Sequence, residues 1–167
     1  MSTIVCPPHR GFTKSVDRGK VFRESLMSDT IWLEISGGIE KTGGDRDNSM
    51  MLKLCADLDA LADKLGVPKL SSFFDDSALV DEYAEELEDV DVDIPPADPV
   101  WFDAGAGSQV VGALLSALRD GSAERGTKLD ASRADWRAML LEELEYCHGA
   151  LKEAAQRSQR FRFLVVP

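Results

Sequence analysis

The sequence contains no long hydrophobic run and little basic charge. Its 167 residues include no apolar stretch near the roughly 18–20 residues that cross a bilayer, so we expect no membrane-spanning helix. Only 19 Lys and Arg side chains stand against 30 Asp and Glu, which gives a formal net charge of −11. Because phosphate binding needs clustered positive charge, this balance argues against direct nucleic-acid binding.

Cysteine and histidine are also scarce. The cysteines are Cys6, Cys55 and Cys147, an odd number without the short spacings of a disulfide framework or a zinc site, which fits a reducing cytoplasm. The histidines are His9 and His148. Because His148 directly follows Cys147 in a predicted helix, the two side chains diverge by about 100° and cannot act as a nucleophile–base pair. We therefore expect no metal or other cofactor and no cysteine-based active site.

The charge pattern divides the chain near Met27. Residues 1–26 carry a net charge of +3, contain a Cys-Pro-Pro motif and lack a sustained apolar period, whereas residues 27–167 carry −14. We interpret residues 1–26 as a basic, flexible extension, or as the product of an upstream start codon. Residues 27–167 then form a single acidic domain of ordinary size.

Two alternating segments rich in β-branched and aromatic residues, 30–36 and 160–166, predict strands near the two ends of this domain. In the first, Ile31, Leu33 and Ile35 share one face, which we expect to be buried. An isolated two-stranded ribbon is only marginally stable. We therefore expect the two strands to pair with each other and helices to cover one face of the pair.

Four segments have apolar residues at the three- and four-residue spacing of amphipathic helices. They are residues 48–65, 76–87, 108–119 and 131–157. Asn48 or Ser49 is placed to cap the first helix. The buried stripe of the first helix includes Cys55 and extends to Leu65, and that of the last helix begins at Trp136. An inert core thiol is therefore expected at Cys55.

These elements together predict an α+β fold, with about four helices packed on a small sheet formed by strands 30–36 and 160–166. The face of the sheet away from the helices carries opposite charges. Glu34 could lie across from Arg160 or Arg162 and form a cross-strand ion pair. The alternative is that these three residues occupy separate surface positions.

The connections around the second and third helices carry further signals. Prolines predict an extended linker over residues 88–99, after which we expect Val100-Trp101-Phe102 to bring the chain back onto the core. Asp75 and Asp76 are interpreted as residues that start the second helix. Gly105-Ala106-Gly107 lacks the further glycine and the lysine of a phosphate-binding loop, so we interpret it as a tight start of the third helix.

The most unusual feature is an acidic segment, residues 75–103. No Lys or Arg occurs between Lys69 and Arg119, and the 12 Asp and Glu residues of that interval all fall within the segment. Such a tract is usually solvated surface, which is one interpretation. The other is a binding surface for a basic partner, because a negative field accelerates the encounter with positive charge.

The predicted second helix places negative charge at an unfavourable position. Glu85, Glu86 and Glu88 lie at its C-terminal end, where each opposes the helix dipole at a cost of about 0.3–1 kcal/mol. Either this helix frays or a cationic group offsets the charge. Arg133 and Arg137 of the last helix could supply that group within the chain, as could a basic partner protein.

The function that we expect is that of a non-enzymatic acidic interaction protein with a basic protein partner, for example an immunity or antitoxin-like protein. Its aromatic anchor would be Trp101 or Phe102. Its charged contacts would be Asp81, Glu82, Glu85, Glu86, Glu88 and Asp89.

Two other classes of function are left open. One is a small carboxylate-dependent enzyme or ligand-binding domain, with a site where the Gly105–Gly107 turn meets the strands. The other is a DNA-mimic protein, whose spaced carboxylates imitate phosphates. A DNA mimic needs its carboxylates on one rigid face, and the proline-rich linker argues against such rigidity.

Overall fold

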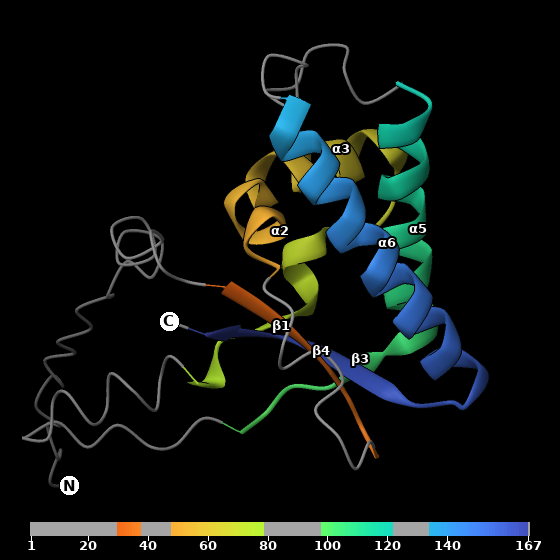
Figure 1. The fold of residues 1–167 in the computed structure, drawn as a ribbon. Helices are drawn as coiled ribbons and strands as arrows, with labels where there is room; N and C mark the ends of the chain where they lie inside the picture. The colour runs from red at the N-terminus through yellow and green to blue at the C-terminus, as the bar shows by residue number, and fades with distance from the viewer. Residues whose placement is uncertain (1–29, 38–47, 79–97, 122–133, 167) are drawn as a thin grey trace, which may run out of the picture.

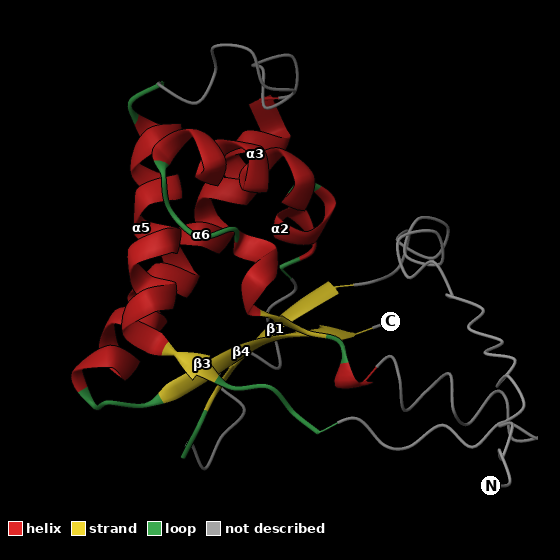
Figure 2. Cartoon of the chain, turned by 180° about the vertical axis from the view of Figure 1, so that it is seen from behind, coloured by secondary structure: helices red, strands yellow, loops and turns green. Residues whose placement is uncertain are grey.

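The structure is a computed structural model that describes residues 30–37, 48–78, 98–121 and 134–166. Within these residues, four helices lie on one side of a small sheet of four strands (Figures 1 and 2). The predicted α+β fold is confirmed, and so is the pairing of the two strands that were expected near the ends of the domain. The proposed division at Met27 lies outside the described residues.

The sheet is built around one central strand, β4 (Arg160–Val166). β1 (Thr30–Ile35) pairs with it antiparallel. The second edge of β4 is occupied by two strands of two residues each. β2 (Phe74–Asp75) runs parallel to β4, and β3 (Phe102–Asp103) runs antiparallel to it. Both ends of the acidic segment therefore join the sheet along the same edge of β4.

The helices differ from the sequence expectation in where they begin and break. They are α2 (Ser49–Lys53), α3 (Cys55–Leu65), α5 (Ala104–Arg119) and α6 (Ala134–Gln156), with a 3-10 turn, η1, at Leu70–Phe73. The helix predicted over 48–65 is in fact two, because the backbone turns at Leu54. α2 buries three consecutive residues against α6 and β1, whereas α3 packs on α5 and η1. A single straight helix has one apolar stripe, so it could not pack on α6 and β1 with its first half and on α5 and η1 with its second half.

Two side chains expected in the core are exposed instead. Leu65 is 39% exposed because it is the last residue of α3, just before Gly66 turns the chain with a φ of +69°. Trp136 is also 39% exposed. The next residue, Arg137, donates a hydrogen bond to the carbonyl of Leu118, which lies at the C-terminal end of α5. The first turn of α6 therefore extends past the end of α5, and α5 does not cover Trp136. The buried stripe of α6 therefore starts at Leu140.

The start of α5 shows why Gly107, one of three glycines in this helix, is needed there. The expected start was near Ser108, but Asp103 caps the helix by accepting a hydrogen bond from Ala106 N at 2.8 Å. A Cβ on Gly107 would lie 2.3 Å from Cζ of Phe161. Glycine therefore allows α5 to lie directly on the sheet, a requirement that helix propensity cannot reveal.

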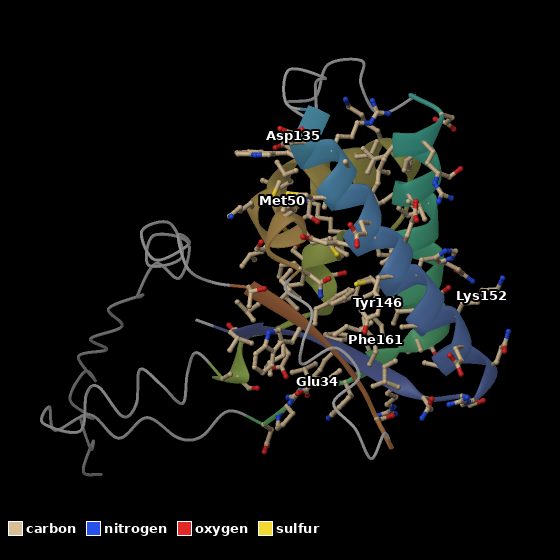
Figure 3. All side chains as sticks on the ribbon, in the orientation of Figure 1. Glu34, Met50, Asp135, Tyr146, Lys152 and Phe161 are labelled. Atoms are coloured by element: carbon tan, nitrogen blue, oxygen red, sulfur yellow. The ribbon has the colours of Figure 1, made fainter. Side chains whose placement is uncertain are left out.

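The core lies between the sheet and the helices. On the sheet side, Phe161 and Phe163 are fully buried with ring centroids 5.2 Å apart, and Phe73 packs on Phe161 with centroids 5.5 Å apart. Figure 3 shows Phe161 between the sheet and the lower ends of the helices. The fully buried leucines that complete the core from the helices and η1 are Leu58, Leu70, Leu114, Leu118, Leu140, Leu144 and Leu151.

A buried carboxylate from α6 caps the start of α2. Glu143, only 6% exposed, accepts hydrogen bonds from Met50 N at 3.2 Å and Met51 N at 2.8 Å. Asn48 occupies the expected capping position but makes no side-chain capping bond. Its amide instead donates to the carbonyl of Ile31 at 3.0 Å, which ties α2 to β1. The cap therefore comes from a residue more than 90 positions away in the sequence.

Replacing Glu143→Gln is expected to lower the free energy of unfolding by about 1–3 kcal/mol, because an amide presents only one acceptor to two buried N–H groups. Glu153→Gln on the exposed face of the same helix is the matched control, with an expected change within about 0.5 kcal/mol. Urea denaturation measures both. An equal effect of the two substitutions would contradict the capping role of Glu143.

Replacing Gly107→Ala is expected to lower the free energy of unfolding by about 1–3 kcal/mol, because the added Cβ overlaps the buried ring of Phe161. Gly149→Ala is the control within a helix. A Cβ there meets no atom within 4 Å, so the substitution should stabilise the protein by about 0.5–1 kcal/mol. Thermal or urea unfolding of both variants checks the opposite signs. Stabilisation by Gly107→Ala would be inconsistent with the close approach of α5 to the sheet.

Candidate functional site

A cluster of charged and aromatic side chains lies on the face of the sheet away from the helices. We call it the Arg162 cluster, and its members are Glu34 on β1, Asp75 on β2, Trp101 just before β3, and Arg162 on β4. Successive side chains of a strand point to opposite faces, so Arg162 faces away from the helices while its neighbours in β4 enter the core. Figure 3 shows Glu34 beside the sheet, below the helix layer.

Arg162 is held between carboxylates from two different strands. Its Nε lies 2.8 Å from Oε2 of Glu34, and its Nη2 lies 2.7 Å from the same oxygen. Its Nη1 lies 2.5 Å from Oδ2 of Asp75. The predicted ion pair of Glu34 therefore forms with Arg162, which the strand register places directly opposite, and Arg160 stays exposed.

The cluster is largely removed from solvent. The side chains of Arg162 and Glu34 are 13% and 16% exposed, and that of Asp75 is 1% exposed. Burial disfavours the charged guanidinium, but hydrogen bonds to Glu34 and Asp75 and their negative charges outweigh this effect and raise the pKa of Arg162. The ring of Trp101 lies 4.9 Å from the guanidinium carbon, a cation–π contact.

Asp75 has a second role at the start of the acidic segment. Its Oδ1 accepts a hydrogen bond from Ser77 N at 3.0 Å, and Ser77 and Ala78 have helical backbone. The interpretation of Asp75 as a residue that starts a helix is thus supported. The pairing of Asp75 with Arg162 was not foreseen, because a strand of two residues has no periodicity to recognise. The signal that was available is Arg162 itself, a charged residue between two phenylalanines of a buried strand.

The carboxylates of the acidic segment differ in role. Asp75 is bound to Arg162 and Asp103 caps α5, so both serve the fold. Asp76 and Asp98 are exposed. The six carboxylates expected to contact a partner lie outside the described residues, namely Asp81, Glu82, Glu85, Glu86, Glu88 and Asp89.

The two aromatic residues expected to contact a partner are placed differently. Phe102 packs on the core, with its ring centroid 5.5 Å from that of Phe73 and 6.2 Å from that of Phe161. Trp101 is partly exposed above Arg162. Both residues bring the chain back onto the sheet as expected, whereas Val100 is 50% exposed.

Arg137, one of the two cations considered for neutralising the acidic segment, contacts the end of α5. Arg137 donates a hydrogen bond to the carbonyl of Leu118 at 2.6 Å, at the C-terminal end of α5. This contact suits the negative end of the α5 dipole. Arg133 lies outside the described residues.

The two cysteines in the described part of the chain are partly or fully buried. Cys55 is only partly buried and, contrary to the expectation, does not belong to the core. Burial and, to a smaller extent, the charge of Asp59 raise the pKa of Cys55 to about 12, which disfavours a reactive thiolate. Cys147 is fully buried, with its Sγ 3.8 Å from Sδ of Met51 on α2. The neighbouring His148 instead lies against Gly112 on α5. The two side chains thus diverge as expected.

A shallow groove lies beside α6. It has a volume of about 530 Å³ and lies where Ile35 and Gln159 meet Tyr146 and Ala150. The acidic and basic side chains at its rim include Glu153 and Arg157, which pair with each other. The Gly105–Gly107 turn, suggested as an alternative site, is part of α5, with Gly107 against the ring of Phe161.

Within the described residues, no group of three or more His, Cys, Asp or Glu side chains is arranged to hold a metal ion. No helix in that part of the chain is both long and apolar enough to cross a membrane. Comparison of the chain with models of protein families, with curated proteins and with solved structures found no match. The function must therefore be argued from the Arg162 cluster and the acidic segment that it borders.

Replacing Arg162→Met is expected to lower the free energy of unfolding by about 3–5 kcal/mol, because Asp75 then becomes a buried carboxylate without a cation. Glu34→Gln keeps the contact between Arg162 and Asp75, so a smaller loss of about 1 kcal/mol is expected. Chemical denaturation gives both values. If Glu34→Gln destabilised the protein more than Arg162→Met, the assignment of Asp75 as the more dependent partner would be wrong.

Proposed function

We propose that this protein is a non-enzymatic interaction protein that binds a basic partner protein through its acidic segment. The observation that carries the proposal is the attachment of both ends of the segment to one edge of β4. Asp75 in β2 pairs with Leu164, and Asp103 in β3 pairs with Arg160, four residues away. At about 3.3 Å per residue, the two attachment points lie only about 13 Å apart along the strand. The segment is therefore a long insertion on a narrow, structured base.

The charge of the acidic segment is not offset at this base. Of its 12 carboxylates, Asp75 and Asp103 are engaged by the fold, which leaves ten in a segment without Lys or Arg. Two cations of β4 lie beside the base. Arg162 is already shared between Glu34 and Asp75, so these three charges together sum to −1, and Arg160, opposite Asp103, adds a single exposed positive charge. A partner rich in Lys and Arg would supply the missing positive charge, and the field would increase its association rate.

Negative charge would attract the partner over a distance, and an aromatic side chain would then contact it directly. The charged contacts are the six carboxylates from Asp81 to Asp89 named above, and Trp101, partly exposed just before β3, is the aromatic contact. An immunity or antitoxin-like protein that blocks a cationic toxin in the cytoplasm is one concrete form of this function. We propose no direct contact with nucleic acid, because the available charge has the wrong sign.

The test compares two variants of equal net charge. The first replaces the six predicted contacts from Asp81 to Asp89 by their amides. The second, a matched control, replaces six carboxylates of α3 and α6 by their amides, namely Asp57, Asp63, Asp135, Glu142, Glu145 and Glu153. Binding of a lysine-rich peptide is measured by titration calorimetry at low and at moderate salt. We expect the first variant to lose about tenfold or more in affinity at low salt and the control to stay close to wild type.

An equal loss of peptide binding in both variants would show that only the net charge matters, which would contradict the proposal. A partner protein is then sought by affinity capture at low salt. A single basic protein that binds the wild type and the control variant, and forms the complex again from purified components, would identify the partner. Binding that persisted in the variant of the acidic segment would place the interface elsewhere.

A further inference from the structure

The two ends of the acidic segment meet at one side chain. Nη1 of Arg162 lies 2.5 Å from Oδ2 of Asp75, the first residue of the segment. The guanidinium carbon of the same arginine lies 4.9 Å from the ring of Trp101, two residues before the end of the segment. One group on the central strand therefore contacts both the outgoing and the returning chain.

The shape of the guanidinium explains how it can serve both ends. Glu34 accepts from Nε and from Nη2, which fixes the plane of the group. Nη1 is then directed at Asp75, and the guanidinium carbon lies over the ring of Trp101. A lysine ammonium has neither this fork nor this flat face, so it could not replace the arginine in all three contacts.

The backbone pairing at this edge is short and needs such support. β2 and β3 each contribute two residues to the sheet, far fewer than an ordinary strand. Short edge strands with few backbone hydrogen bonds open locally at low free-energy cost. The side-chain contacts of Arg162 therefore add to the packing of Phe74 and Phe102 in holding the two ends of the segment.

We infer that Arg162 is a positioning residue, which couples the two described ends of the acidic segment, at Asp75 and Trp101, and thereby strengthens binding of the basic partner. This inference rests on the proposed function. Arg162 itself is not part of the proposed contact surface, because its side chain is only 13% exposed and its three nitrogens each already contact Glu34 or Asp75. It acts by lowering the conformational entropy that the segment loses on binding, so its loss weakens binding while every predicted contact residue stays in place.

The coupling is tested by hydrogen exchange followed by mass spectrometry on the full chain. Asp75→Asn weakens the contact at the first end, and Trp101→Leu removes the contact at the second. If Arg162 couples the ends, each substitution accelerates exchange about tenfold at both ends, in peptides covering 74–78 and 100–103. Exchange in the central parts of α5 and α6 should not change. Acceleration confined to the substituted end would overturn the inference.

Arg162→Lys provides the second measurement, with Arg119→Lys as control. The lysine variant keeps the charge but loses the fork, so we expect faster exchange at both ends and weaker binding of the lysine-rich peptide. Arg119→Lys makes the same change in an exposed ion pair with Glu145, at the end of α5 opposite to the one that joins β3, and should leave both quantities near wild type. If Arg162→Lys accelerates exchange throughout α5 and α6, the single-end substitutions decide the question in its place.

The outcomes separate this inference from the proposed function. If the wild-type chain does not bind the lysine-rich peptide or any basic partner, the proposed function fails, whatever the exchange rates show. If the wild type binds, and Arg162→Lys accelerates exchange at both ends without changing affinity, the positioning role is overturned and the proposed function stands. Unchanged exchange in the folded Arg162→Lys variant would overturn the inference directly.

Discussion

The pairing of β1 with β4 is the contact on which both faces of the sheet depend. It sets Leu33 opposite Phe163 on the face that packs under the helices, and Glu34 opposite Arg162 on the other face. A shift of one residue in this register would turn every side chain of one strand to the opposite face. Arg162 would then enter the core and lose its carboxylate partners, a costly burial of unpaired charge. The hydrophobic core and the Arg162 cluster are thus two consequences of one register.

Buried polar side chains connect the elements around this sheet. Glu143 ties α6 to the start of α2, and Asn48 ties α2 to the carbonyl of Ile31 in β1. Asp75 ties β2 to β4 through Arg162. Each of these groups satisfies a partner in a different element, and each would be unfavourable if that partner moved away. Apolar packing makes the core stable, while these contacts add directional constraints on how the elements meet.

The acidic segment combines a structured base with charge that the base does not neutralise. Its ends are held by β2, β3 and the contacts of Arg162, whereas its exposed carboxylates have no Lys or Arg within the segment to pair with. Structured ends limit the entropy lost on association, and excess charge of one sign selects a partner of the other sign. The six carboxylates between Asp81 and Asp89 stay a prediction from the sequence, since they lie outside the described residues.

The sequence by itself determined the elements whose signal is local. Alternation over 30–36 and 160–166 predicted both long strands, and three- and four-residue spacing predicted α5 and α6 to within a few residues at their ends. Only the tertiary structure decided that β2 and β3 exist, that Glu143 caps α2, that Gly107 belongs inside a helix and that Arg162 binds Asp75. Each of these features depends on contacts between residues far apart in the chain, and strands of two residues are too short to show a period. Local pattern fixes which face of an element is apolar, but the partner that meets that face is chosen only when the chain has folded.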